Sequence, residues 1–273
     1  MARGIFGGAV IAQALSAAMK TVDPALHVHS MHSYFVLAYL CSMRLFNSRG
    51  DSSIPVVYSV EIVRDGRSFA TRTVRSLQRG AVIFVLTASF QKPEPSPLHH
   101  SMPSPIHLVP APEDMHAPTP EEYAQTIYQK IVKTAAAPTK QTKMSPFIAK
   151  ARAGSDDNGE ELIKSLSEEY TARPIDFRYV HDREVKASAR TSQPTEYRQY
   201  SWFKANGVIS SDPRMHAVAL AYASDHNLLS TAVGSHRGKW DFSDISVMVS
   251  LDHIIYFHDV GPFLYDTDDR KSR

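Results

Sequence analysis

The feature of the sequence that most constrains the fold is a pattern that occurs twice. An apolar, helix-like run, GGAVIAQALSAAMKTV (Gly7 to Val22), precedes a strand-like run that ends in His-Ser-Tyr-Phe. A second helix-like run, which begins at Pro213, precedes VSLDHIIYF, and in both copies a histidine is shortly followed by Tyr-Phe. Self-similarity of this kind indicates a repeated supersecondary unit. The sequence therefore predicts an internal repeat of a helix and a histidine-bearing strand.

The two copies are incomplete in opposite ways. The second copy has two strand-like runs before its helix, Pro174 to Val180 and Tyr197 to Asn206, where the first has only the few residues before Gly7. The first copy is followed by three strand-like runs, where the second has only Asp259 to Arg273, which is too short for three strands. We expect each copy to lack what the other retains.

The strands of the first copy carry their own turn signals. The strand-like runs after Gly7 to Val22 are His27 to Phe35, Pro55 to Val63, Phe69 to Leu77 and Val82 to Phe90. The last three are separated by the short glycine-containing stretches RDG and QRG, which are typical of hairpin turns. They should therefore form an antiparallel meander, and one helix on such a sheet is an α+β layer.

The middle of the chain has a different composition. Residues 92 to 120 contain nine prolines, which indicates a linker of polyproline character. A short helix is expected from Glu121 to Val132, and SDDNGEELIKSLSEE after it is expected to be a charged, solvated segment. The predicted organisation is a first unit at 1–91, a linker with a short helix at 92–172, and a second unit at 173–273.

Composition excludes several function classes. Acidic and basic residues nearly balance, at a formal charge of +2, so no strong attraction to nucleic acid or membrane surfaces is implied. The single cysteine, Cys41, excludes an internal disulfide and fits a reducing compartment, and no zinc-type spacing of cysteine and histidine predicts a metal site. The most apolar run is too short to span a bilayer, so the chain is expected to be intracellular. A nucleophile elbow, a Walker loop and a dinucleotide fingerprint are all absent from the sequence.

An aspartate interrupts an apolar helical stripe in the second copy. Asp212 and Pro213 form a good helix start, which sets the frame for the stripe. Residues on one face of that helix are Met215, Val218, Tyr222, Asp225 and Leu229. A carboxylate on a buried face costs several kcal/mol unless it is hydrogen-bonded or neutralised. The alternative is a helix that ends near Ala223 and turns Asp225 into water, and periodicity alone favours neither.

Six segments together point to a family. IFGGAVIAQALSAA, VHSMHSYF, RDGRSFATRTV, VIFVLTASFQ, YASDHNLL and VSLDHIIYFH occur in this order and cover both halves of the chain. They resemble the type II acyl-CoA thioesterases, a double-hotdog family that includes peroxisomal acyl-CoA hydrolases. The resemblance implies an α+β double hotdog, with two long helices each packed on an antiparallel sheet, here incomplete at both termini. It also implies a homo-oligomer.

The resemblance extends to the catalytic residues. In the family an aspartate, a threonine or serine, and a glutamine hold the water that attacks the thioester carbonyl. The aspartate matches Asp225 in YASD and the hydroxyl matches Ser250 in VSLDH, whereas the glutamine matches no residue of this chain. The implied activity is hydrolysis of fatty acyl-CoA to free fatty acid and coenzyme A without a covalent intermediate. No separate cofactor is expected. The alternative is a catalytically impaired protein that binds acyl-CoA or a partner.

Further candidates for substrate binding each have a structural alternative. His29 is the repeat counterpart of Ser250 and would approach the pocket, although a histidine satisfied by backbone is the favoured interpretation. Arg64 and Arg67 flank a turn, where solvated charges are the default and contact with coenzyme A phosphates is the alternative. His253 is expected to be structural.

Two glycines begin the first helix-like run. Gly7 and Gly8 are expected to permit close approach of the helix to a strand, and as the alternative their amides would receive a carbonyl oxygen or phosphate.

The sequence also departs from the family pattern. YLCSMRLFNSR (Tyr39 to Arg49) stands where the family has a short loop. We hypothesise that a retained intron or a faulty gene model produced this insertion and both short ends, which sequencing the transcript would test; the alternative is a diverged protein. The resemblance favours a peroxisomal location, but the chain ends in KSR, which is not a Ser-Lys-Leu-type address, so the alternative is the cytoplasm.

Overall fold

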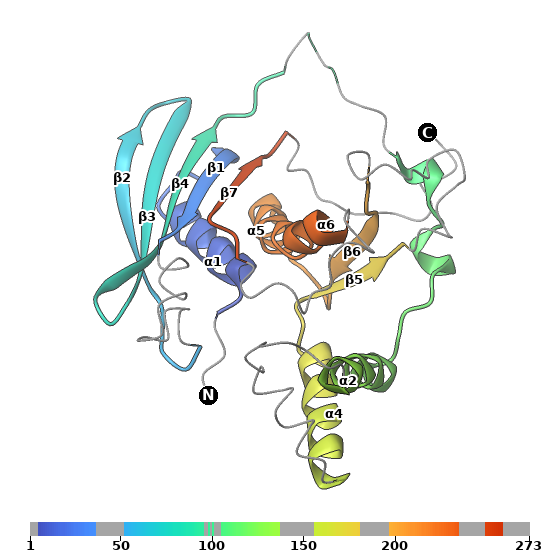
Figure 1. The fold of residues 1–273 in the computed structure, drawn as a ribbon. Coiled ribbons are helices and arrows are strands. Elements are labelled where there is room, and N and C mark those ends of the chain that lie inside the picture. Colours follow the sequence, from blue (N-terminus) through green and yellow to red (C-terminus); the bar gives the residue numbers. More distant parts are fainter. Residues whose placement is uncertain are drawn as a thin grey trace. The chain divides into compact units, whose positions relative to one another are not determined.

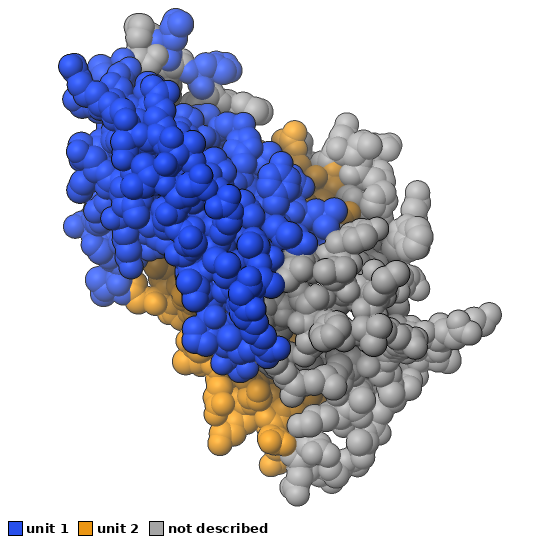
Figure 2. Space-filling view, turned by 90° about the vertical axis from the view of Figure 1, so that its left-hand side faces the viewer, with its two compact units in different colours: residues 1–101, 208–229, 247–273 blue, residues 102–207, 230–246 orange. Residues whose placement is uncertain are grey.

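The chain divides into two compact units. The computed structural model describes residues 5–36, 52–95, 98, 100, 105–136, 156–180, 197–234 and 249–258. Unit 1 consists of residues 1–101, 208–229 and 247–273, and unit 2 consists of residues 102–207 and 230–246 (Figure 2). The predicted insertion, Tyr39 to Arg49, lies outside the described residues. The division at residues 92 and 173 stays a prediction.

Unit 1 is built on a five-stranded sheet. Its strands are β1 (His27–Phe35), β2 (Val57–Asp65), β3 (Phe69–Gln78), β4 (Ala81–Gln91) and β7 (Asp252–Tyr256). They are ordered β2-β3-β4-β1-β7, and every neighbouring pair is antiparallel (Figure 1). The predicted meander is therefore confirmed as β2-β3-β4. The predicted repeat brings its two histidine-bearing strands, β1 and β7, side by side.

The hairpin between β3 and β4 shows why the turn signal was informative. Arg79 and Gly80 connect the two strands, and both have positive φ values, 49° and 77°. Two left-handed residues in succession are characteristic of the tight hairpin turn whose twist matches that of the sheet. The QRG sequence supplies a glycine at the second of these positions.

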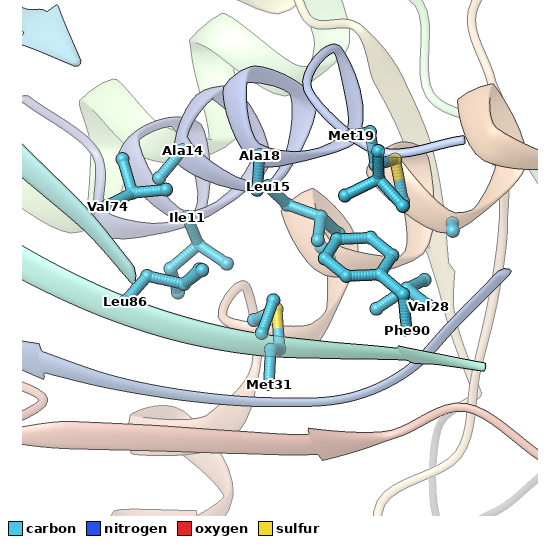
Figure 3. Packing of buried hydrophobic residues seen from close by; sticks show 14 of the residues in the cluster. Ile11, Ala14, Leu15, Ala18, Met19, Val28, Met31, Val74, Leu86 and Phe90 are labelled. Carbon is cyan, nitrogen blue, oxygen red and sulfur yellow. The ribbon is translucent and has the colours of Figure 1, made fainter. Parts of the chain in front are cut away.

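Helix α1 (Gly7–Met19) covers the inner face of the sheet. Its buried side chains, among them Ile11 and Leu15, meet Met31, Leu86 and Phe90 from β1 and β4 (Figure 3). At about 1.5–3 kcal/mol for each large apolar side chain removed from water, this cluster dominates the stability of the unit. The apolar run at the start of the chain is therefore a core helix.

Helix α5 (Pro213–Ser224) packs against α1 within unit 1 (Figure 1). As predicted, Asp212 caps its first turn, with the carboxylate accepting a hydrogen bond from Arg214 N at 2.9 Å, and Pro213 follows. The predicted stripe was wrong in two respects. The helix ends before Leu229, and Met215 is 43% exposed.

The buried apolar residues of α5 are small. Ala217, Ala221 and Ala223 are buried there, whereas Val218 and Tyr222 are only partly so. Alanine has no side chain beyond Cβ, so a face of alanines lets two helices approach closely. The stripe failed because the residues that approach α1 most closely are the small ones rather than the large ones.

Unit 2 contains the remaining elements. They are the short 3-10 helices η2 (Pro105–Leu108) and η3 (Pro112–Asp114), helices α2 (Pro120–Ala136) and α4 (Asp156–Thr171), and strands β5 (Ile175–Tyr179) and β6 (Ser201–Ala205). Helix α6 (Leu228–Gly234) begins at the end of the unit 1 segment 208–229. Strands β5 and β6 form a two-stranded antiparallel ladder.

The expected linker is more regular than its composition suggested. Thr119 and Glu122 begin α2 with a reciprocal capping box, in which each backbone N–H donates to the side chain of the other. The segment expected to be charged and solvated is helix α4, which packs on α2 through Ala124, Leu162 and Leu166. The prediction was incomplete: the charged residues do remain in water, but two leucines, one helical turn apart, suffice to bury a narrow face.

Candidate active site

Asp225 is fixed by its neighbours in unit 1. It is the C-cap residue of α5 and is half-buried. Ser250, just before β7, donates a hydrogen bond from Oγ to Asp225 Oδ1 at 3.1 Å. The structure thus brings together the two residues predicted to be catalytic. Each of the two sequence interpretations of Asp225 was partly right. The helix does end near Ala223, but the carboxylate remains half-buried and does not turn fully into water.

The N-terminus of α1 approaches the same carboxylate. The backbone N–H of Gly8 hydrogen-bonds to Asp225. A Cβ on Gly7 would lie 2.6 Å from Asp225 Oδ2 and 3.0 Å from Phe35 Cζ, so only glycine leaves room for the carboxylate there. The first-turn amides of a helix carry a partial positive charge that favours an anion. The amide of Gly8 therefore binds the Asp225 carboxylate, an anion that belongs to the protein itself.

The predicted reason for the second glycine needs correction. A Cβ on Gly8 would collide with the backbone oxygen of Tyr222 in α5 and with the ring of Phe6. The close approach that requires glycine is therefore one of helix to helix, where the sequence predicted helix to strand. Only at Gly7, next to Phe35 of β1, does a strand side chain set the limit.

The surroundings of Asp225 shift its acidity. Burial raises the pKa of Asp225 above its usual range, and this is the largest influence. The Ser250 hydrogen bond, the charge of His253 and the Gly8 N–H each lower that pKa and offset part of the rise. A carboxylate with a raised pKa is a better proton acceptor at neutral pH, provided that it is still ionised. The site thus has the character of a general base.

Aromatic rings stand beside this carboxylate. Phe6, the N-cap residue of α1, makes edge-to-face contacts with Tyr222 and His226, with ring centroids 5.1 and 6.1 Å apart. Phe35 packs on Phe84 at 5.0 Å. Phe6 and Phe35 were not predicted to lie at this site, although both belong to segments that carry the family resemblance, whereas Tyr222 was predicted on the same helical face as Asp225.

The other predicted binding residues lie elsewhere in unit 1. His29 occupies the irregularity in β1, where the register shifts between Val28 and Ser30, and its carbonyl accepts a hydrogen bond from Phe257 N at 2.8 Å. Arg64 and Arg67 are exposed at the β2–β3 hairpin. Within the described residues, no hydrogen bond or ion pair joins these three side chains to Asp225 or Ser250, and their role in substrate binding stays a prediction.

The described residues contain neither a metal-binding cluster nor a helix that could span a membrane. No group of three or more histidine, cysteine, aspartate or glutamate side chains within them could hold a metal ion. None of the helices within them is long and apolar enough to cross a membrane.

Two family models match the chain. The acyl-CoA thioesterase N-terminal domain matches residues 1–91, and the acyl-CoA thioesterase model matches residues 174–268. Acyl-coenzyme A thioesterase 8 of Rattus norvegicus is 34% identical over 267 residues, which cover 96% of this chain and 67% of that protein. Acyl-CoA thioesterase 2 of Haemophilus influenzae is 33% identical over 260 residues, covering 94% and 72%.

More distant similarities agree in class. Peroxisomal acyl-coenzyme A thioester hydrolase 1 of Saccharomyces cerevisiae is 26% identical over 276 residues, covering 94% of this chain and 72% of that protein. Acyl-CoA thioesterase II TesB2 from Mycobacterium marinum has a TM-score of 0.54 and 28% identity, covering 94% and 71%. A hot dog fold protein from Alicyclobacillus acidocaldarius, with a TM-score of 0.52, 18% identity and coverage of 95% and 69%, is similar in fold.

These similarities define a hydrolase with the hotdog fold. The chain belongs to the type II acyl-CoA thioesterase family. The predicted family and the predicted α+β hotdog class are both confirmed.

Proposed function

We propose that this chain hydrolyses fatty acyl-CoA to free fatty acid and coenzyme A through a water molecule activated by Asp225. The observation that carries the proposal is the half-buried Asp225 carboxylate, held by Ser250 Oγ at 3.1 Å and by the Gly8 N–H. A carboxylate fixed on both sides is held ready to accept a proton from water in one defined direction. Ser250 orients the carboxylate and the water.

The reaction proceeds in two steps and requires no separate cofactor. The water oxygen attacks the thioester carbonyl carbon while Asp225 takes the proton, and a tetrahedral oxyanion forms. The oxyanion then collapses, the carbon–sulfur bond breaks, and the proton on Asp225 passes to the departing thiolate of coenzyme A. The fatty acid leaves directly, so no bond forms between enzyme and acyl group.

Release of coenzyme A from a medium-chain acyl-CoA tests the proposal. Asp225→Asn should lose about 10²–10⁴-fold in kcat, because general-base catalysis contributes that much. Ser250→Ala should lose about 10–100-fold, the value of one hydrogen bond to a charged group, and Ser250→Thr should retain most activity because it keeps the hydroxyl. Asp212→Asn is the matched control on the same helix, since asparagine caps a helix as well as aspartate does.

Three outcomes would contradict the mechanism. Turnover by folded Asp225→Asn at the wild-type rate would exclude its role as a base. Trapping of an acylated Asp225 with hydroxylamine would show covalent catalysis. A folded wild-type chain that binds acyl-CoA in calorimetry without releasing coenzyme A would instead establish the binding-only alternative.

We also propose a peroxisomal location and a homo-oligomeric state. The location is supported by the similarity to the yeast relative, whose name places it in the peroxisome. Co-localisation of a fluorescent fusion with a peroxisomal marker, and light scattering of the purified chain, test these two proposals.

A further inference from the structure

His253 is held firmly on the inner face of β7. The residue is only 7% exposed, and it pairs in register with Ser33 of β1. The Ser33 hydroxyl, which is fully buried, donates to the His253 carbonyl oxygen at 2.9 Å. Its backbone is therefore tied to β1 by more than the sheet ladder, and its ring has little freedom.

The ring of His253 meets the end of α5. Its Nε2 lies 2.9 Å from Ser224 Oγ, and Ser224 directly precedes Asp225. The Ser224 hydroxyl also donates to the Ala221 carbonyl oxygen at 2.9 Å. A hydroxyl has only one proton, so the Ser224 oxygen must accept in the contact with His253. The proton of that contact therefore resides on His253 Nε2.

With its proton on Nε2, the imidazole of His253 interacts favourably with the end of α5. An N–H of the imidazole points at the C-terminal end of α5, where the helix carries its partial negative charge. Asp225 is the C-cap residue of the same helix end, a poor place for a carboxylate by itself. The charge of His253 favours the ionised form of Asp225, as do Ser250 and Gly8.

Other titratable groups of the described residues lie close to Asp225 along the chain or next to His253 on β7. Tyr222 and His226 lie near Asp225 in the sequence of the α5 segment, and the first turn of α1 carries no acidic residue. On β7, the neighbouring Asp252 is exposed. His253 is thus the buried titratable group that faces Asp225 from the sheet.

We propose that His253 is a positioning residue of the thioesterase site, which acts through Ser224 to fix the end of α5 and supports the Asp225 carboxylate without touching the substrate. This inference rests on the proposed function of Asp225. It assigns to His253 a role beyond the structural one expected from its sequence context. Ser224 transmits this role, because it links the histidine to the end of α5.

Two substitutions separate the hydrogen bond from the charge. His253→Gln keeps an N–H that can reach Ser224 but cannot become positive, whereas His253→Leu removes both. His258→Gln, an exposed histidine just beyond β7, is the matched control. Coenzyme A release is measured from pH 5 to 9, together with thermal unfolding of each variant.

The expected results differ between the variants. His253→Gln should leave KM within about twofold and shift the acid limb of the kcat/KM profile to higher pH, because the carboxylate loses the favourable charge interaction with His253. His253→Leu should show the same shift and lose about tenfold or more in kcat, a part of the general-base contribution. His258→Gln should match the wild type.

A second readout does not depend on turnover. Carbon-13 NMR titration of the aspartate carboxyl groups, with Asp225→Asn used to assign the signal, should show the pKa of Asp225 higher in His253→Gln than in the wild type. An unchanged pH profile and an unchanged carboxyl titration in folded variants would overturn the inference. An inactive wild type in which the titration still shifts would refute the proposed hydrolysis and leave the electrostatic influence of His253 on Asp225 established.

Discussion

Unit 1 and unit 2 differ most in how they bury apolar residues. In unit 1, α1, the five-stranded sheet and α5 contribute to one continuous cluster of buried side chains. In unit 2, the described residues form two small clusters, one around Met115 and Val180 and one between α2 and α4. A carboxylate can be kept inside a protein only where its surroundings are rigid enough to satisfy it.

The comparison explains where the site is built. Asp225 and Ser250 belong to the later part of the chain, within the residues 174–268 that match the second family model. Both nevertheless lie in unit 1, because α5 packs on α1 and β7 pairs with β1. The second copy of the repeat thus contributes the reactive groups, and the core that holds them includes α1 and the strands of the first copy.

The largest expected difference in stability between the two units concerns one arginine in each. Arg72 in unit 1 is 1% exposed and donates to Thr21 Oγ1 and O, to the carbonyls of Arg64 and Thr71, and to Asp65 Oδ1 at distances of 2.6–3.0 Å. Arg72→Ala should cost about 3 kcal/mol of unfolding free energy, because it removes these hydrogen bonds and empties the space that the buried side chain fills. Arg72→Lys should not restore this, since one ammonium cannot serve acceptors spread around a planar guanidinium.

The unit 2 counterpart is Arg173. It stacks on the rings of Tyr123 and Tyr170, at 4.4 and 5.2 Å from their centroids. Arg173→Ala should cost only about 1 kcal/mol, the usual value of such a contact near the surface. Urea unfolding of both variants measures the difference. Equal losses of unfolding free energy would contradict the idea that the buried polar groups of unit 1 are the more fully hydrogen-bonded.

Two glycines provide the next test. In Gly8→Ala the new methyl group meets backbone of α5 and must force the two helices apart, which should cost about 1–3 kcal/mol and lower thioesterase activity. The atoms nearest to a Cβ on Gly159, in α4 of unit 2, belong to Tyr128, whose hydroxyl would lie 2.9 Å away, and that side chain can move.

Gly159→Ala should therefore gain up to about 1 kcal/mol from helix propensity. Thermal unfolding and coenzyme A release of the two variants decide the matter. A stabilised, fully active Gly8→Ala chain would show that α1 and α5 are not in close contact.

The smallest expected effect is a pH dependence of stability. Burial raises the pKa of Asp225 in the folded chain, so the folded state holds that proton more tightly than the unfolded state does. Stability from this group is present below the unfolded value of about 3.9 and is lost as pH rises through the folded pKa. Asp225→Asn should therefore gain stability over the wild type as pH rises from about 3.5 to 7. Thermal unfolding across that range, with no such gain, would refute the direction of the shift.

Much of unit 1 could be predicted because its signals are local. Strand β1 agrees with the predicted His27 to Phe35, and β3 and β4 end within one residue of their predictions. Alternation of side chains and glycine-containing turns act between residues close in sequence, so they are visible without a fold. Helix α4 was missed because only two leucines mark its buried face.

The sequence by itself determined the α+β class, the meander, the internal repeat and, through the family resemblance, the pairing of Asp225 with Ser250. Only the tertiary structure decided that the amide of Gly8 reaches Asp225 and that Gly7 leaves room for the Asp225 carboxylate. It also decided that His253 contacts Ser224, the residue before Asp225. The physical reason is that these contacts join α1, α5 and β7, which are distant along the chain. Periodicity describes one element at a time, whereas the satisfaction of a buried charge depends on all the elements that enclose it.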